Sequence, residues 1–411
     1  MSVRILHVVG DSKFGGASHG ILRLARFWRS LGWEAELLTT DPMMLAAAAK
    51  SGVTTVPLDV IWREIRPIRD LVGLFRLYRY LQAHPYTLIH THTTKAGFIG
   101  RVAARMASCP TIVHTAHGFA FHEESSTAKI AFYTMFERLA SYCCDCVVAV
   151  SRFHRDWGIR LGMCPSKKWM VITNGIPQPD AVSQDEIAAT RESWGVEPGT
   201  LVILNHGRVV TEKGLEDLVA AAHLLKHRLG RPFLVVFAGE GALRGELERM
   251  ADALGVQNQV RFLGFRSDVT NLLAAADIVA LPSLREGLSI ALLEAMAMAR
   301  PIIATTIGSN REVSREGEAA LLIPPNAADS LADAIERLAR DPDEALRLAK
   351  RAGEIYHEEY RIDRMMAGYH QLYLDLLTAR GLQPLNSGEG ISNKENYDAE
   401  PVSALLPSLD R

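Results

Sequence analysis

The 411-residue chain has no long hydrophobic run and few cysteines, and both absences limit what it can be. No apolar stretch reaches the roughly 18–20 residues that a membrane-spanning helix needs. No signal-peptide pattern precedes Arg4, where a short strand is expected to begin. The five cysteines offer no zinc spacing, because Cys143, Cys144 and Cys146 have no second ligand pair. We therefore expect a cytoplasmic protein with free thiols and no bound metal.

Three ligand-binding signatures are also missing. The glycine-rich loop 10–16 lacks the pattern G-x-G-x-x-G, and no acidic residue follows at the ribose position, which disfavours a dinucleotide cofactor. No dense Lys/Arg tract or known reader motif occurs, so nucleic acid is not expected as a partner. No Asp-x-Asp pair stands at an expected strand end, since Asp341 and Asp343 fall in a turn between helices. The sequence thus predicts neither a cofactor nor a metal.

The formal net charge of −2 is distributed unevenly along the chain. Residues 1–180 contain 21 Lys and Arg against 13 Asp and Glu, whereas the remainder contains 24 against 34. The basic half also contains nine of the fourteen histidines. This asymmetry indicates that the N-terminal half meets an anionic partner, for which a membrane surface or a phosphorylated acceptor fits better than nucleic acid. Ordinary solvated surface charge remains the alternative.

The length predicts two domains, and apolar runs that alternate with helical patterns predict parallel sheets built from βαβ units. A polar, turn-rich break at 174–180 separates two such series. We expect one domain at 1–178 and a second at 179–360. A C-terminal helix at 361–381, which could pack back on the first domain, and a disordered tail at 382–411 are expected to follow. The expected strands are 4–9, 35–39, 54–58, 87–90, 111–115, 146–150, 170–172, 201–205, 233–237, 259–263, 277–281, 302–305 and 319–323.

The segment 282–297 carries the strongest chemical signal. Pro282 ends an apolar strand, and a loop with Glu286 leads into an apolar helix. A junction of this kind directs free backbone N–H groups and the positive end of a helix dipole at one point, which suits a phosphate. Glu286 beside that point and Glu294 within the helix could hold a sugar at one end and a ribose at the other. The segment predicts a nucleotide-sugar site.

A second loop, 206–214, follows the first strand of the second domain and supplies two cations. Arg208 offers a planar fork of donors and Lys213 a point charge, a combination that suits a diphosphate leaving group. Either cation alone would be read as a solvated loop residue. The segment 282–297 in the same domain favours contact with phosphate.

Four motifs in the second half resemble the retaining enzymes of glycosyltransferase family 4. They are G-R-x-x-x-x-K-G at 207–214, G-E-G at 239–241, L-G-F-R-S-D-V at 263–269 and P-S-x-x-E-G-L-S-x-x-x-L-E-A-M-A at 282–297. The resemblance extends over about residues 4–375. It implies an α/β protein of GT-B fold, in which two doubly wound, Rossmann-like domains face each other across a cleft.

The resemblance also implies roles for individual residues on the donor side. Glu286 contacts the donor sugar, Glu294 the ribose, and Arg208 and Lys213 the diphosphate. The further donor-binding residues that it implies are Gly16, Gly207, Glu240, Phe265 and Arg266 near the base, and Leu288 and Ser289, which present backbone N–H groups. The chain departs from the frequent family pattern at Gly308-Ser309, where Gly-Gly is common, and at 174–177, where N-G-[VI]-D is common.

The N-terminal segments 90–101 and 114–123 resemble family members of capsule and exopolysaccharide assembly, which extend sugars on polyprenyl diphosphate at the inner membrane face. His117 stands where the family has a histidine near the reacting sugar, and we count it with Arg208, Lys213 and Glu286 as catalytic. The expected acceptor-side residues are Gly15, His92, Lys95 and Phe119. His90 and His92 share one face of a strand end, but a metal pair is disfavoured there.

The resemblance predicts a retaining, metal-independent hexosyltransferase that takes a nucleotide-diphospho-sugar, with UDP favoured over GDP. Its acceptor is a glycan or a lipid-linked sugar of bacterial surface polysaccharide. The stretch 61–79, rich in Arg and aromatic residues, could rest on the anionic inner membrane, or could form an amphipathic core helix with a basic outer face. A nucleotide-sugar epimerase of similar fold and a non-catalytic scaffold of a polysaccharide-assembly complex remain as alternatives.

Overall fold

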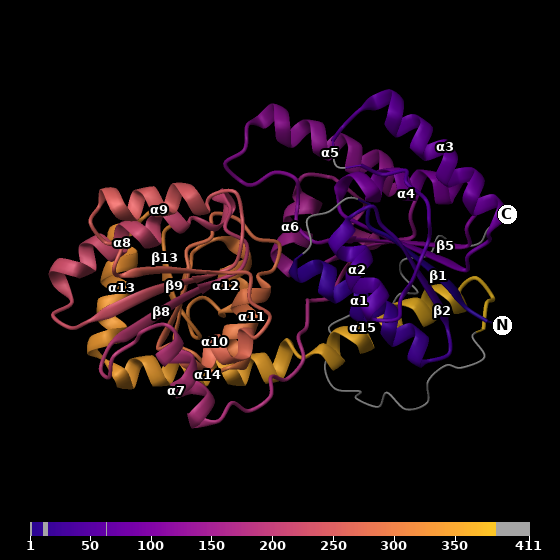
Figure 1. Ribbon diagram of the computed structural model, residues 1–411. Coiled ribbons are helices and arrows are strands. Elements are labelled where there is room, and N and C mark those ends of the chain that lie inside the picture. Colours follow the sequence, from indigo (N-terminus) through magenta and orange to yellow (C-terminus); the bar gives the residue numbers. More distant parts are fainter. Residues whose placement is uncertain (1, 11–14, 63, 384–411) are drawn as a thin grey trace. The chain divides into compact units, whose positions relative to one another are not determined.

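The computed structural model describes residues 2–10, 15–62 and 64–383, and the chain divides into two compact units (Figure 1). The first unit runs to Asn174 and takes up the chain again from Asp363 onward; the second is Gly175–Ile362. The division therefore falls at Asn174 rather than at residue 178. The tail expected at 382–411 lies outside the described residues from residue 384 on.

Among its described residues, the first unit contains a seven-stranded parallel sheet in the order β3-β2-β1-β4-β5-β6-β7. The strands are β1 (Arg4–Val8), β2 (Glu34–Leu38), β3 (Thr54–Thr55), β4 (Leu88–His92), β5 (Thr111–Ala116), β6 (Cys146–Ala149) and β7 (Trp169–Val171). The helices are α1 (Gly16–Ser30), α2 (Pro42–Lys50), α3 (Pro67–Ala83), α4 (Thr94–Met106), α5 (Thr127–Ser141), α6 (Arg152–Arg160) and α15 (Ile362–Thr378).

The second unit contains a six-stranded parallel sheet in the order β10-β9-β8-β11-β12-β13 among its described residues. The strands are β8 (Leu201–His206), β9 (Phe233–Ala238), β10 (Val260–Gly264), β11 (Ile278–Leu281), β12 (Ile302–Thr305) and β13 (Leu321–Ile323). The helices are α7 (Gln184–Ser193), α8 (Leu215–Arg228), α9 (Arg244–Ala253), α10 (Val269–Ala275), α11 (Ile290–Ala297), α12 (Gly308–Val313), α13 (Ala328–Arg340) and α14 (Pro342–Glu359).

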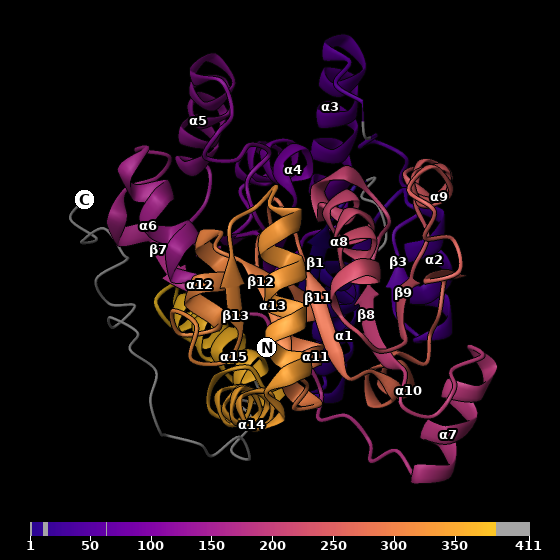
Figure 2. The ribbon, with the colours of Figure 1, turned by 90° about the vertical axis from the view of Figure 1, so that its left-hand side faces the viewer.

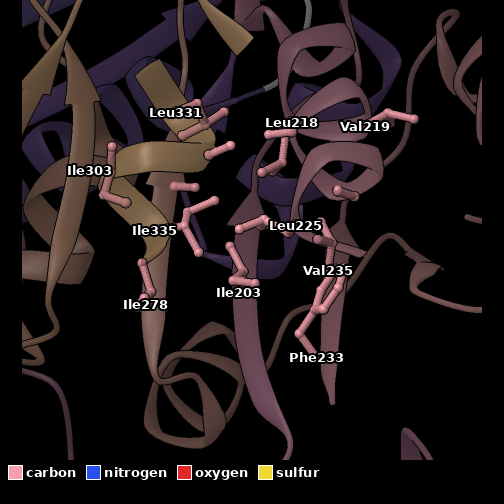
Figure 3. Packing of buried hydrophobic residues seen from close by; sticks show 14 of the residues in the cluster. Ile203, Leu218, Val219, Leu225, Phe233, Val235, Ile278, Ile303, Leu331 and Ile335 are labelled. Atoms are coloured by element: carbon pink, nitrogen blue, oxygen red, sulfur yellow. The ribbon is translucent and has the colours of Figure 1, made fainter. Parts of the chain in front are cut away.

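The central strands are buried on both faces, which explains why they read as continuous apolar runs without alternation. Figure 3 shows this packing in the second unit, where Ile335 of α13 lies between Ile278 of β11 and Ile203 of β8, in the same buried cluster as Leu331. Leu218 and Leu225 of α8 cover the neighbouring part of the sheet. The core thus fixes β8 and β11 side by side.

In both sheets the chain order reverses between two neighbouring strands, β1 and β4 in the first unit and β8 and β11 in the second. Ligands of doubly wound sheets bind beyond the carboxyl ends of the strands at such a switch point. The loops after β8 and β11 are 207–214 and 282–289, the two segments that carry the strongest sequence signals. The topology therefore brings both signals to one edge of one sheet.

Helix α15 returns to the first unit and is tied to its sheet by polar and aromatic contacts. The Tyr373 hydroxyl lies 2.5 Å from Nδ1 of His90, and the Tyr369 hydroxyl lies 3.0 Å from Oγ1 of Thr115. The Tyr373 ring stacks on Trp28 of α1, with ring centroids 4.6 Å apart. His90 therefore serves as a bridge between β4 and the C-terminal helix.

Candidate active site

Two glycines let the loops after β8 and β9 come into direct contact. A Cβ atom at Gly241 would lie 2.0 Å from the carbonyl oxygen of Val209, and one at Gly239 would lie 1.7 Å from that of Gly207. Because neither position carries a side chain, the two backbones come close enough for the Val209 N–H to donate to the Glu240 carbonyl at 2.9 Å. The G-E-G motif thus supports the loop that presents Arg208. Arg208 is exposed, whereas the Glu240 carboxylate accepts a hydrogen bond from Arg244.

The loop after β8 is also tied to the loop after β11. Gly214 has a φ of +60°, and a Cβ atom there would lie 2.2 Å from the Pro282 carbonyl oxygen. The Leu284 N–H donates to the Glu212 carbonyl at 2.9 Å, and Arg285 pairs with the Glu212 carboxylate at 2.5 Å. The two motif segments therefore form one connected structure.

Lys213 and Glu286 meet where these loops join. Nζ of Lys213 lies 2.5 Å from Oε1 of Glu286, and the Ser283 hydroxyl donates to the same oxygen at 2.8 Å. The two charged side chains are only 18% and 14% exposed. A carboxylate held by two donors in a largely buried place keeps a fixed orientation. The structure thus brings the expected diphosphate cation and the expected sugar-binding carboxylate together.

Glu294 has a separate partner that the sequence analysis missed. Oε2 of Glu294, on α11, lies 3.0 Å from Nε2 of His206, the last residue of β8. His206 is buried, while Glu294 keeps about a third of its side chain exposed. The sequence signal that could have identified His206 is its position at a strand end, directly before Gly207. Its contact leaves the second carboxylate oxygen of Glu294 for a ligand.

The first turn of α11 begins at the loop that carries Glu286. Ser289 is the N-cap residue, and its hydroxyl accepts a hydrogen bond from the Leu292 N–H. Leu288 and Ser289 are both buried, so their backbone is held in place. The Ser309 hydroxyl donates to the Glu286 carbonyl at 3.3 Å. At Gly308-Ser309, where Gly-Gly is common in the family pattern, a serine side chain thus holds the Glu286 loop in place.

The residues expected near the base lie beyond the edge strand β10. Phe265 is 66% exposed, and Arg266 forms a two-bond pair with Asp268. This pairing with Arg266 lowers the pKa of the Asp268 carboxyl. Strand β9 separates β10 from β8 in the sheet. The exposed Phe265 ring is free to stack on a flat ligand.

The residues expected in the first unit follow three neighbouring strands, β1, β4 and β5. Gly15 is the N-cap of α1, and Gly16 is its first residue. His92 ends β4, and His117 follows β5. Lys95, on α4, pairs with Asp70 of α3 at 2.6 Å. Phe119 lines a cavity together with Thr93, Arg101, His114 and Tyr133.

A row of buried histidines lies behind His117. Its Nε2 is 3.1 Å from Nδ1 of His92, whose Nε2 is in turn 3.2 Å from Nδ1 of His7. Burial lowers the pKa of His117 to about 4 and that of His7 to about 3, and it lowers the pKa of His92 well below its ordinary value. The sequence analysis did not single out His7, because its partners lie far away in the chain.

His7, His90 and His92 also place one ring nitrogen each within 4.8 Å of one another. His90 and His92 therefore do lie close together on one face of the strand, as expected. Both ring nitrogens of His90 and both of His92 already take part in hydrogen bonds. A metal ion at this place would have to displace those bonds.

Comparison with known proteins decides the family. Residues 14–178 match the model of Glycosyltransferase Family 4, and residues 186–354 match that of Glycosyl transferases group 1. A UDP-Gal:alpha-D-GlcNAc-diphosphoundecaprenol alpha-1,3-galactosyltransferase of Escherichia coli is 30% identical over 323 residues, which are 75% of this chain and 83% of the relative. The chain is a family 4 glycosyltransferase.

Other similar proteins agree with this assignment. A D-inositol 3-phosphate glycosyltransferase of Streptomyces bingchenggensis is 26% identical to this glycosyltransferase over 412 residues, covering 94% of this chain and 90% of the relative. The solved structure of Anabaena HepE with UDP and glucose has a TM-score of 0.78 at 23% identity, covering 90% of this chain and 99% of HepE. The glycosyltransferase therefore has the GT-B fold.

In chemical terms the second unit of the glycosyltransferase offers anion-binding groups and two carboxylates at one sheet edge. Lys213 and the start of α11 suit a phosphate, while Glu286 and Glu294 suit hydroxyl groups. Within the described ranges, no helix of this glycosyltransferase is both long and apolar enough to cross a membrane.

Proposed function

We propose that this glycosyltransferase is a retaining, metal-independent hexosyltransferase that moves a hexose from a nucleotide-diphospho-sugar to a glycan or polyprenyl-diphosphate-linked acceptor. Its place is the synthesis of bacterial cell-surface polysaccharide. The observation that carries the proposal is the contact of Lys213 with Glu286. It supplies a cation for the departing diphosphate beside a carboxylate for the sugar. UDP is favoured over GDP, because the Escherichia coli relative is named for UDP-Gal and HepE was solved with UDP.

The transfer step depends on groups that are already oriented. Arg208, Lys213 and the N–H groups at the start of α11 stabilise the negative charge that grows on the diphosphate as the sugar–phosphate bond breaks. The ring then gains oxocarbenium character. The acceptor hydroxyl attacks from the leaving-group side and passes its proton to the diphosphate, which retains the anomeric configuration. Glu286 accepts hydrogen bonds from sugar hydroxyls, and Glu294 accepts them from the ribose.

The absence of a metal or other cofactor is part of this proposal. Two side-chain cations and a helix N-terminus serve the diphosphate, so Mg²⁺ has no role to fill. Sugar transfer should therefore continue at its normal rate in excess EDTA. Loss of activity on chelation, restored by Mg²⁺ or Mn²⁺, would contradict the charge model.

The first unit supports a peripheral contact with an anionic membrane, such as the inner face of the cytoplasmic membrane. Helices α3 and α5 both pack against α4 (Figures 1 and 2), and each exposes an apolar stripe. We name these stripes the α3–α5 face, and its exposed apolar residues are Ile65, Ile68, Leu71, Val72, Phe75, Phe132, Met135, Leu139 and Tyr142. The exposed arginines of α3 and its start are Arg66, Arg69, Arg76 and Arg79. Apolar stripes with basic neighbours are typical of helices that lie in a membrane interface.

Vesicle sedimentation tests this contact. The protein should sediment with phosphatidylglycerol-containing vesicles at low salt and be released at high salt, because each basic residue contributes roughly 1 kcal/mol that salt screens. Replacing Arg66, Arg76 and Arg79 by Ala should weaken binding, whereas Lys226→Ala on α8 of the second unit is the matched control. Equal sedimentation of both variants, or none at low salt, would remove the membrane from the proposal. Arg63 of the expected basic stretch lies outside the described residues.

Transfer itself is tested with labelled UDP-hexoses and a bacterial polyprenyl-diphosphate-sugar extract. Label should enter the lipid fraction, and NMR of the released product should show the anomeric configuration of the donor. Inverted product would contradict the retaining mechanism. Release of an epimerised sugar without any acceptor would favour the epimerase alternative, and a complete lack of turnover with every donor would favour the scaffold.

A further inference from the structure

Three histidines, His7, His92 and His117, are bonded head to tail through alternate ring nitrogens. Nδ1 of His7 faces Nε2 of His92, and Nδ1 of His92 faces Nε2 of His117. Within the described residues, the two terminal atoms, Nε2 of His7 and Nδ1 of His117, are buried and have no hydrogen-bond partner. We name this row the histidine chain. It crosses the sheet from β1 through the end of β4 to the loop after β5.

A neutral imidazole carries one N–H and one lone pair, so each link constrains the next. The three rings are neutral at physiological pH, because burial lowers the pKa of each and the ring of His90 adds to the effect at His92. Burial, and after it the guanidinium of Arg101, also lower the pKa of the neighbouring His114. Only two arrangements then satisfy both bonds. Either all three rings are protonated at Nδ1, or all three are protonated at Nε2.

The two arrangements differ at the ends of the histidine chain. Protonation at Nδ1 leaves a bare lone pair on His7 and an N–H on His117. Protonation at Nε2 leaves an N–H on His7 and a bare lone pair on His117. A buried N–H without a partner is rarer and costlier than an unfilled lone pair. Both terminal atoms are buried, but His7 as a whole is fully buried in β1, whereas His117 lies in the loop after β5 and keeps part of its surface exposed. The costly group therefore belongs at the His117 end, where a ligand can satisfy it.

We propose that His7 and His92 are positioning residues that lock His117 in its Nδ1–H tautomer, so that it presents a neutral hydrogen-bond donor to an oxygen of the donor sugar. The role at the sugar rests on the proposed function, but the tautomer does not. A neutral donor binds a sugar hydroxyl without placing a second positive charge beside the developing oxocarbenium. In water, by contrast, free histidine prefers the Nε2–H tautomer.

Nitrogen-15 NMR of the full-length protein labelled in its histidines reads the tautomer directly. His7, His92 and His117 should each show a protonated Nδ1 and an unprotonated Nε2. His7→Phe removes the donor to His92 and should turn His92 and His117 into a tautomer mixture. His7→Asn, whose amide can donate from near the position of Nδ1, should restore the wild-type pattern. His370→Asn is the matched control, because His370 is buried in the same unit outside the histidine chain.

Kinetics add a reading that a merely structural role would not move. His7→Phe should lower kcat by on the order of 10-fold, the size expected for one transition-state hydrogen bond, and His7→Asn should recover most of it. UDP affinity should stay unchanged in both variants, since the proposed UDP site lies in the second unit. A loss of UDP binding would instead mean that the proposed function is wrong or that the variant is misfolded. A thermal unfolding measurement on the variant separates these two cases.

Three results would overturn the inference. One is protonation of Nε2 in wild-type His117. Another is an unchanged His117 tautomer in His7→Phe. The third is stoichiometric binding of Zn²⁺ that shifts the signals of His7, His90 and His92 together, which would make the cluster a metal site.

Discussion

At the scale of single residues, the two glutamates of the segment 282–297 have different partners. Glu286 is held by Lys213 and Ser283, whereas Glu294 is held by His206. A carboxylate that accepts hydrogen bonds from an ammonium group and a hydroxyl is held in one orientation, and can accept bonds from sugar hydroxyls. The separation of partners agrees with the separate roles expected for sugar and ribose.

Glu286→Gln should therefore separate turnover from nucleotide binding. Sugar transfer should fall by on the order of 10²-fold, because an amide accepts hydrogen bonds more weakly than a carboxylate and no longer balances the charge of Lys213. UDP affinity, measured by calorimetry, should be equal or higher, since Lys213 is released to the diphosphate. Glu248→Gln on the exposed side of α9 is the control. Transfer at the wild-type rate in Glu286→Gln would show that the carboxylate does not serve the sugar.

The buried histidines also predict how the stability of the first unit depends on pH. Burial lowers the pKa of His7 to about 3, and of His117 and His154 to about 4. As the pH falls below about 6.5, the unfolded chain binds protons that the folded unit does not. The contribution of these histidines to the free energy of unfolding is therefore fully present above that pH. The free energy of unfolding should fall on acidification, by up to about 1.4 kcal/mol per pH unit for each histidine.

Urea unfolding between pH 7 and pH 5 checks this prediction. His154→Gln should reduce the slope of stability against pH by the share of one histidine, because His154 lies outside the histidine chain. A stability that stays level or rises on acidification would show that the histidines are charged in the folded unit.

At the scale of helices and strands, the apolar runs were sufficient to predict most of the fold. The expected strand at 201–205 is Leu201–His206 in the structure, and that at 302–305 is Ile302–Thr305. The expected strand 54–58 is shorter, Thr54–Thr55, because only two of its residues pair with β2. Central strands covered on both faces leave an unmistakable apolar signal, whereas an edge strand does not.

The contacts of the site were less predictable than its elements. The motif residues Lys213 and Glu286 were found from local patterns, but their contact depends on β8 and β11 being neighbours in the sheet. His206 and His7 carry no motif, and their roles come from partners about 85 residues or more away in the chain. Pairings over such distances follow from the topology, which no short segment encodes.

Gly241→Ala tests the element-scale packing of the β8 and β9 loops. The new methyl group would meet the Val209 carbonyl at 2.0 Å, so the loop that presents Arg208 must move. We expect the free energy of unfolding to fall by about 1–3 kcal/mol, as in other overpacked sites, and UDP affinity to fall with it. Gly20→Ala on α1 is the control, because nothing lies within 4 Å of that position. Unchanged stability and UDP affinity in Gly241→Ala would show that the loops tolerate separation.

At the scale of the whole molecule, the two units carry different chemistry. Residues 1–180, which have an excess of basic over acidic residues, contain the α3–α5 face and the histidine chain. The remainder has an excess of acidic residues, and it contains the cations of the proposed donor site. Overall charge therefore does not reveal where the diphosphate binds. The placement of a few cations at a switch point of the sheet matters more than the net charge around them.

Calorimetric titration with UDP tests the central claim most directly, because it needs neither the sugar nor the acceptor. The wild-type protein should bind UDP in EDTA-containing buffer. Arg208→Ala and Lys213→Ala should each bind it about 10- to 100-fold more weakly, since each loses a charge-assisted bond to phosphate. Lys226→Ala, an exposed cation of α8 bonded to the Gly255 carbonyl, should bind like the wild type. Wild-type affinity for UDP in both Arg208→Ala and Lys213→Ala would contradict the account.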